Sequence, residues 1–225
     1  PGVKPLAGPE ARTIFLGFDQ VRDELLYSNI KGKNPFKDVR VRKAFAHAIN
    51  VEAIKKKVMR GASFPAGLMV APQIGGFAKD LNAHWAYDTG KAKKLLADAG
   101  YPNGFEVTMD CPNDRYVNDE KICQASASML ARIGGKVKVL AQTKSKYFGK
   151  GLAQKNYDTS FFLLGWAPGT MDSHQAIEPL MSCRTKEKGR GLFNLGGYCN
   201  ERVYELAPMI ESETDQAKRT AMIKE

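Results

Sequence analysis

The stretch that decides the fold is FEVTMDCPNDRYVNDEKICQASASMLARIGGKVKVLAQ, residues 105–142. Apolar and polar residues alternate at 105–110, which is typical of a half-buried strand. Apolar residues at helical spacing then predict a helix over about 118–133, and the glycine pair after it ends this helix. A second alternating segment at 137–141 predicts another strand. A strand, a helix and a strand in this order indicate an α/β layered fold.

Strands and helices also alternate on both sides of this stretch. Helix N-caps are predicted at Asp38 and Asp88, each directly before a one-sided apolar pattern. The other expected elements are a strand at 13–18, helices at about 39–49 and 51–60, a loop at 62–86, helices at about 88–99 and 145–154, a strand at 157–166, and helices at 174–182 and 201–224. The strand at 157–166 is apolar enough to lie inside the sheet.

Composition limits the class of protein. The chain has 225 residues, 43% of them hydrophobic and 26% charged, which suits one large soluble domain or two small ones and excludes a disordered chain. No apolar run approaches the ~18 residues that a membrane helix needs. The net charge of +10 raises the alternative of a nucleic-acid binder. The basic residues are spread along the chain without a long block, so we do not favour this alternative.

The residues that carry catalytic chemistry elsewhere form no recognisable motif here. His47, His84 and His174 lie far apart, and His47 is expected on the solvated polar face of its helix. The sequence contains no nucleophile elbow, phosphate loop or dinucleotide-binding glycine motif. A hydrolase that uses Asp172 and His174 remains a remote alternative. We therefore expect no enzyme activity, no cofactor and no metal site.

The four cysteines, Cys111, Cys123, Cys183 and Cys199, leave two interpretations open. Their spacings of 12 and 16 residues match no zinc pattern. Two local disulfides are one interpretation, and these would require an oxidising compartment. Four buried free thiols are the other.

Candidate ligand-binding residues cluster after the predicted strands. Arg115 and Tyr116 follow a strand end, where open α/β sheets place their ligands, and a guanidinium suits a carboxylate. Trp166 ends the buried strand, and Asp172 and Asn194 lie further on. The alternatives are a surface turn for Arg115 and a core position for Trp166.

Two longer motifs carry a family resemblance. They are NPFKDVRVRKAF at residues 34–45 and YDTGKAKKLLADAGYP at residues 87–102, followed by Ile133-Gly134 and Gly165-Trp166. Together they resemble the extracytoplasmic solute-binding proteins of family 5, the dipeptide, oligopeptide and nickel-binding components of ABC importers. The resemblance extends over residues 12–225.

The resemblance implies an architecture, a location and partners. Family members have two α/β lobes with the ligand between them, so residues 12–225 are expected to form the second lobe, a mixed sheet flanked by helices that stops before the final strands. Residues 1–11 would be the linker from the first lobe. The implied protein is periplasmic or lipid-anchored, monomeric and disulfide-bonded, with Cys183 and Cys199 at the positions of a bridged pair in dipeptide binders. Its partners would be a peptide or small-molecule ligand and an ABC permease, and not a nucleic acid.

The resemblance also assigns roles within the site. Arg115 resembles the arginine that grips a dipeptide carboxylate, and Trp166 resembles the aromatic residue that lines the pocket. Gly169 stands where dipeptide binders have the aspartate that holds the α-ammonium group, and Asp172 matches a later aspartate of the same loop. The expected ligand is a peptide or peptide-like solute. The alternative is an opine, an amino-acid derivative, a nickel complex or another anionic solute.

Overall fold

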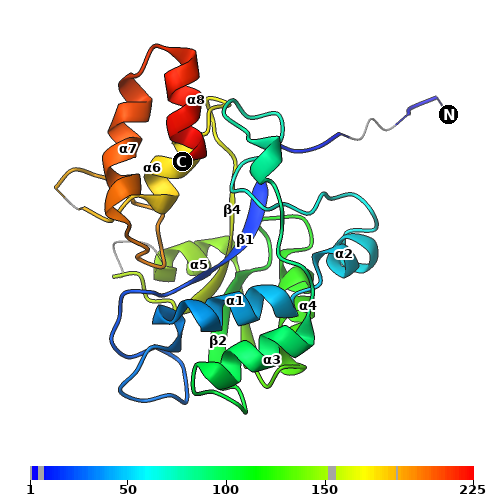
Figure 1. Cartoon of the computed structure of the whole chain (residues 1–225). Helices are drawn as coiled ribbons and strands as arrows, with labels where there is room; N and C mark the ends of the chain where they lie inside the picture. The colour runs from blue at the N-terminus through cyan, green and yellow to red at the C-terminus, as the bar shows by residue number, and fades with distance from the viewer. Residues whose placement is uncertain (1, 5–7, 152–155, 186) are drawn as a thin grey trace.

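A mixed four-stranded sheet forms the centre of the fold (Figure 1). The computed structural model describes residues 2–4, 8–151, 156–185 and 187–225, and within these the strand order is β1-β4-β2-β3. Strand β1 (Thr13–Phe18) is antiparallel to β4 (Phe161–Trp166), whereas β2 (Glu106–Pro112) is parallel to both β4 and β3 (Lys136–Gln142). This confirms the predicted α/β fold with a mixed sheet, and β4 lies inside the sheet as expected.

One face of the sheet is covered by α1 (Val39–Ala48), α3 (Thr89–Asp98) and α4 (Asp119–Ala131). Phenylalanine rings fill the space between these helices and the strands, with centroids 4.7 to 5.9 Å apart. The rings belong to Phe18, Phe36, Phe45, Phe105 and Phe161. Offset and edge-on aromatic pairs of this kind contribute beyond the area that they bury.

The other face packs against a second apolar cluster. Phe162 and Leu164 point into it, because successive side chains of a strand alternate between the faces of the sheet. Helices α5 (Lys144–Gly151) and α6 (His174–Met181) contribute to this cluster. Beyond α6 lie α7 (Glu201–Ser212) and α8 (Gln216–Lys224), the red C-terminal helix in Figure 1.

Both predicted helix caps are confirmed. The Asp38 carboxylate accepts a hydrogen bond from the Arg40 backbone N–H at 2.8 Å, and Asp88 accepts one from Lys91 at 2.8 Å. Each carboxylate satisfies a backbone donor that has no partner inside the helix. One short 3₁₀ turn, η1 (Pro35–Lys37), lies directly before α1. Another, η3 (Lys79–Leu81), lies within residues 62–86, the segment expected to be a loop.

Two helix predictions need correction. The expected helix at 51–60 is only α2 (Val51–Ala53) followed by a π-helical turn, η2 (Ile54–Val58). The expected helix at 201–224 breaks into α7 and α8, because Asp215 takes an extended backbone and caps α8 through two backbone N–H groups. The predicted end of the helix at 145–154 falls on residues 152–154, which lie outside the described residues.

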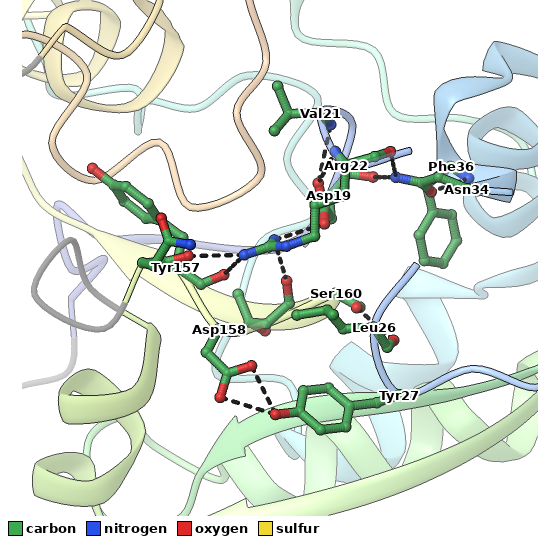
Figure 2. Close-up of polar contacts among 12 residues, drawn as sticks. Asp19, Val21, Arg22, Leu26, Tyr27, Asn34, Phe36, Tyr157, Asp158 and Ser160 are labelled. Atoms are coloured by element: carbon green, nitrogen blue, oxygen red, sulfur yellow. Dashed lines mark hydrogen bonds and ion pairs between the residues drawn. The ribbon is translucent and has the colours of Figure 1, made fainter. Parts of the chain in front are cut away.

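The strand expected at 157–166 begins only at residue 161, because the preceding backbone turns. Asn156 and Tyr157 both have left-handed φ values, 55° and 52°, which cannot continue a strand. The Arg22 guanidinium donates to the carbonyls of both residues at 2.8 and 2.9 Å and pairs with Asp19 (Figure 2). A distant arginine therefore stabilises the turn that shortens the strand.

A second contact ties the same turn to the segment before α1. The Tyr27 hydroxyl donates to the Asp158 carboxylate at 2.7 Å (Figure 2). This hydrogen bond, with partial burial, raises the pKa of Tyr27 to about 12.

His47 is not a solvated surface histidine, as its helix pattern predicted, but a buried one. Its Nδ1 lies 2.7 Å from the Ala86 carbonyl oxygen, and its ring meets Trp85 edge-on at 5.3 Å. The segment before α3 runs along the polar face of α1, where the Asp88 backbone N–H donates to the His47 carbonyl. A periodic pattern cannot reveal a loop that crosses the helix face from elsewhere in the chain.

Both local disulfides are present, Cys111–Cys123 and Cys183–Cys199. The first joins the end of β2 to α4, and the second closes the loop between α6 and α7. This decides between the two interpretations that the cysteine spacing left open. Among the described residues, no helix combines the length and the hydropathy needed to cross a membrane.

Candidate ligand-binding site

One edge of the sheet gathers the ends of three strands. The register of the antiparallel pair sets Thr13, where β1 begins, opposite Trp166, where β4 ends. Because β2 runs parallel to β4, the connection after β2 reaches the same edge, and that connection carries Arg115 and Tyr116. The topology therefore places these backbone segments at one edge, although Tyr116 packs against the first apolar cluster and Trp166 against the second, on the other face of the sheet.

Tyr116 packs against β4 at this edge of the sheet. Its hydroxyl donates to the Gly165 carbonyl oxygen at 3.1 Å, and its ring lies so close to β4 that a Cβ on Gly165 would be 2.8 Å from Cε1. Heavy atoms do not pack at such a distance, so a larger residue opposite the ring would displace the Tyr116 or Ile14 side chain. Burial of the phenol raises the pKa of Tyr116.

Two guanidinium groups flank the Tyr116 ring. The Cζ atom of Arg115 is 5.2 Å from the ring centroid, and that of Arg12 is 5.5 Å away. Arg115 is exposed, whereas Arg12 forms an ion pair with Glu10 at 2.6 Å. A cation over an aromatic face is attracted by the ring quadrupole, so Tyr116 holds both positive groups at the sheet edge.

Hydrogen bonds to the Asp119 side chain hold the backbone of Arg115 in place. This buried carboxylate accepts hydrogen bonds from the backbone N–H groups of Arg115 at 3.0 Å and Tyr116 at 2.9 Å. Asp119 is the first residue of α4, so the connection between β2 and α4 is anchored to the helix. The Arg115 side chain thus projects from an ordered turn.

Arg12 was not among the residues that the sequence analysis singled out. Arg12 lies beside Tyr116 because β1 pairs with β4, and this pairing joins segments about 150 residues apart. A basic residue directly before a strand is too common a signal to identify it from sequence.

Trp166 is half-buried and is held in place by two contacts. Its indole Nε1 donates to the Gln175 carbonyl oxygen at 2.6 Å, and its ring packs on Phe193 at 4.9 Å between centroids. The indole donor is therefore already used, and what Trp166 offers a ligand is the exposed part of its ring.

Asp172 does not present a free carboxylate. Arg219 of α8 donates to both carboxylate oxygens at 2.8 Å, and the His174 backbone N–H donates at 2.8 Å. The hydrogen bonds from Arg219 hold the pKa of Asp172 below its ordinary value. Asp172 is therefore engaged within the chain by α8 and by the backbone at the start of α6.

Gly169 is exposed and has room for a side chain. A Cβ at this position would have its nearest neighbour, Gln175 Oε1, at 3.5 Å, an ordinary contact distance. Packing therefore does not require glycine here. The lack of a carboxylate at residue 169 is a chemical feature of the site rather than a consequence of space.

Asn194 is buried and uses its whole side-chain amide inside the chain. Its Nδ2 donates to the carbonyls of Ser182 at 2.9 Å and Tyr198 at 2.6 Å, and its Oδ1 accepts from the Tyr198 backbone N–H. These bonds shape the loop that the Cys183–Cys199 disulfide closes. The structure brings Arg115 and Tyr116 together at one edge, with Trp166 ending the neighbouring strand, and gives Asn194 a role in the loop.

The arrangement suits binding of a negatively charged solute. Exposed cationic and aromatic surface lies at the carboxyl ends of parallel strands, where open α/β sheets bind ligands. Among the described residues, no group of three or more His, Cys, Asp or Glu side chains is placed to hold a metal ion.

A sequence model that describes bacterial extracellular solute-binding proteins, family 5 Middle, matches residues 1–188. The chain belongs to family 5 of the bacterial extracellular solute-binding proteins. This confirms the resemblance seen in the two sequence motifs.

One curated member of the family illustrates the similarity. The glutathione-binding protein GsiB of Escherichia coli (strain K12) is 32% identical over 196 residues, which make up 85% of this chain and 37% of that protein. The chain thus spans little more than a third of the length of the curated relatives that it matches.

Solved structures of solute-binding proteins share the fold. The dipeptide binding protein from Pseudoalteromonas sp. SM9913, in complex with Met-Leu, has a TM-score of 0.79 at 24% identity, over 96% of this chain and 40% of that chain. The ABC transporter-associated periplasmic binding protein DppA from Helicobacter pylori, in complex with the peptide STSA, has a TM-score of 0.73 at 23% identity, over 95% and 38%. At these identities the likeness shows the fold alone.

Proposed function

We propose that this chain is the second lobe of a two-lobed receptor that captures a peptide or peptide-like solute for an ABC importer. The observation that carries the proposal is the Tyr116 ring flanked by the guanidinium groups of Arg115 and Arg12 at the carboxyl edge of the sheet. A guanidinium fork binds a carboxylate through two parallel hydrogen bonds, which is the chemistry that a peptide C-terminus requires.

The proposed mechanism is capture without chemical change. A second lobe would close over this edge by a hinge, and the closed form would dock on the permease outside the cytoplasm. Residues 12–225 would form the lobe and residues 1–11 the connection to its partner lobe. The share of 37% that the chain covers in GsiB supports a longer receptor, and the binding proteins among its relatives support a receptor rather than an enzyme.

A second candidate ligand, an anionic solute without a free ammonium group, is favoured by Gly169. A peptide ammonium held near Trp166 would need a carboxylate, since an unpaired buried charge is costly. Gly169 supplies none, and both oxygens of Asp172 are occupied by Arg219. An acidic amino-acid derivative whose amine is acylated, or an opine whose amine is closed into a lactam, would place only negative and uncharged groups at this edge.

The test is solute binding by the protein at its natural full length. Native mass spectrometry after purification without denaturation would identify a retained solute, and calorimetry would measure affinity for that solute, for glutathione and for the dipeptide Met-Leu. We expect Arg115→Ala to weaken binding of an acidic ligand by about 2 kcal/mol or more, roughly thirtyfold in Kd, because a charge pair loses one partner.

The matched control is Arg132→Ala. Arg132 is an exposed guanidinium just past α4, at the opposite end of that helix from Arg115. We expect the Arg132→Ala variant to bind the solute with the same Kd as the wild type. Equal affinity of the wild type and the Arg115→Ala variant for every bound solute would remove Arg115 from the site, and turnover of the solute would contradict a receptor.

A further inference from the structure

A basic pocket lies beside the π-helical turn, outside the cluster around Tyr116. Its volume is about 360 Å³, within the range of pockets that hold small ligands. The residues that line it are Lys57, Val58, Met59, Arg60, Asn118 and Lys121. Three of these six side chains are cationic, and the others are apolar or amide.

The backbone on both sides of the pocket is unusual. The π-turn widens the helix, with the Met59 N–H bonded to the Ile54 carbonyl five residues back, and Arg60 follows with a left-handed φ of 52°. Opposite, Asn118 has a left-handed φ of 58° and donates from Nδ2 to the Val58 carbonyl at 3.2 Å. π-turns and left-handed non-glycine residues both concentrate at functional sites.

The charges around the pocket are uncompensated. Some lysines on the surface form ion pairs, as Lys37 does with Asp23 and Lys94 with Asp98. In the part of the chain that the structure describes, no ion pair includes Lys57, Arg60 or Lys121. Three cations around one concavity give a local positive potential that favours an anion.

We propose that this pocket binds a phosphate group, either free or in a phosphate ester or lipid headgroup. One arginine fork and two lysine point charges suit the several oxygens and the double charge of phosphate better than a carboxylate with a single charge. The apolar surface of Val58 and Met59 offers contact to the carbon atoms of an ester. The lining includes none of Arg12, Arg115 and Tyr116, so the proposal does not depend on the proposed solute.

The test is binding of inorganic pyrophosphate, measured by calorimetry on the full-length protein at low ionic strength. We expect saturable binding with one site in the wild type and at least a tenfold rise in Kd in the Lys57→Gln/Lys121→Gln double variant. The matched control is Lys91→Gln/Lys93→Gln, which removes the same charge from exposed lysines on α3. Its Kd should stay within twofold of the wild type.

A second arm separates the two sources of phosphate. Co-sedimentation measures binding to vesicles of phosphatidylglycerol and phosphatidylcholine, with vesicles of phosphatidylcholine alone as the comparison. Binding to the mixed vesicles only would show that the pocket accepts the phosphate of a lipid headgroup. Binding that depends on the pocket lysines in either arm supports the proposal. Binding in neither arm, or equal loss in both double variants, overturns it.

The fold of each variant is checked by circular dichroism. If the pocket double variant does not fold, Arg60→Asn replaces it, because asparagine tolerates the left-handed backbone. The same tenfold rise in Kd is expected there. Because pyrophosphate binding needs no transported solute, failure of the receptor proposal would leave this result unchanged.

Discussion

At the scale of single residues, Gly165 is the position on which the candidate site depends. Its missing Cβ lets the Tyr116 ring approach β4, and its carbonyl accepts the Tyr116 hydroxyl. That ring in turn lies beneath the guanidinium groups of Arg115 and Arg12. The glycine next to the end of β4 thus makes room for the ring on which two cations lie.

We predict that Gly165→Ala destabilises the protein by about 1 to 3 kcal/mol, the usual effect of forcing a methyl group into a packed position. The new Cβ would lie 2.5 Å from Ile14 Cδ1 and 2.8 Å from Tyr116 Cε1. Urea denaturation measures the change. The control is Gly90→Ala near the start of α3, where the nearest atom is 3.4 Å away and alanine should not destabilise the helix. Equal stability of the two variants would show that the ring adjusts freely.

At the scale of elements, the ion pair between Arg219 and Asp172 attaches α8 to the start of α6. Arg219 also donates from Nε to the Ile210 carbonyl at 2.9 Å, so one guanidinium joins α8 to α6 and α7. The two side chains are largely shielded, with 14% and 30% of their surfaces exposed. The pair therefore retains more of its Coulomb attraction than a surface ion pair does.

We predict that Arg219→Gln lowers stability by about 1 kcal/mol at pH 7, a value discounted for the exposed part of the pair. The folded protein holds the pKa of Asp172 low, so its contribution is complete above the unfolded-state pKa of about 3.9 and disappears as the pH falls through the lower folded-state value. Denaturation at a series of pH values should show the variant and the wild type converging in acid.

The control for this prediction is Arg202→Gln. Arg202 forms exposed ion pairs with Glu225 and Glu205 on the outer surface of α7 and α8. Such pairs are screened by water, so little change is expected at any pH. A constant difference between Arg219→Gln and the wild type down to pH 2 would show that the arginine acts through packing and not through its charge.

At the scale of the whole molecule, two disulfides connect different parts of the fold. Cys111–Cys123 is buried in the first apolar cluster, where it joins the end of β2 to α4 just below the candidate site. Cys183–Cys199 is partly exposed and closes the loop before α7. The loops span 12 and 16 residues, for which chain entropy gives a stabilisation of roughly 3 kcal/mol each.

We predict that a mild reductant opens Cys183–Cys199 first under native conditions, because a thiolate reaches only an accessible sulfur. Alkylation followed by mass spectrometry identifies the reduced pair. The Cys183→Ala/Cys199→Ala variant should lose about 3 kcal/mol of stability. Earlier labelling of Cys111 and Cys123 would contradict the order of exposure in the fold.

Several local features of the fold could be predicted from the sequence. Asp38 and Asp88 cap helices as expected, because a cap depends on a backbone N–H two or three residues away. The alternation at 105–110 and 137–141 likewise marks β2 and β3. Where distant segments intervene, prediction failed, as when Arg22 stabilises the turn before β4 and a loop buries His47.

For the candidate site, the sequence alone determined which chemical groups are available: Arg115 and Tyr116, which follow a strand, and Trp166, which ends one. The tertiary structure decided what each group can do. It set Arg12 beside Tyr116 and occupied Asp172 with Arg219. The physical reason is that periodicity and capping arise between neighbours in the chain, whereas strand pairing and side-chain packing join residues that only the folded chain brings together.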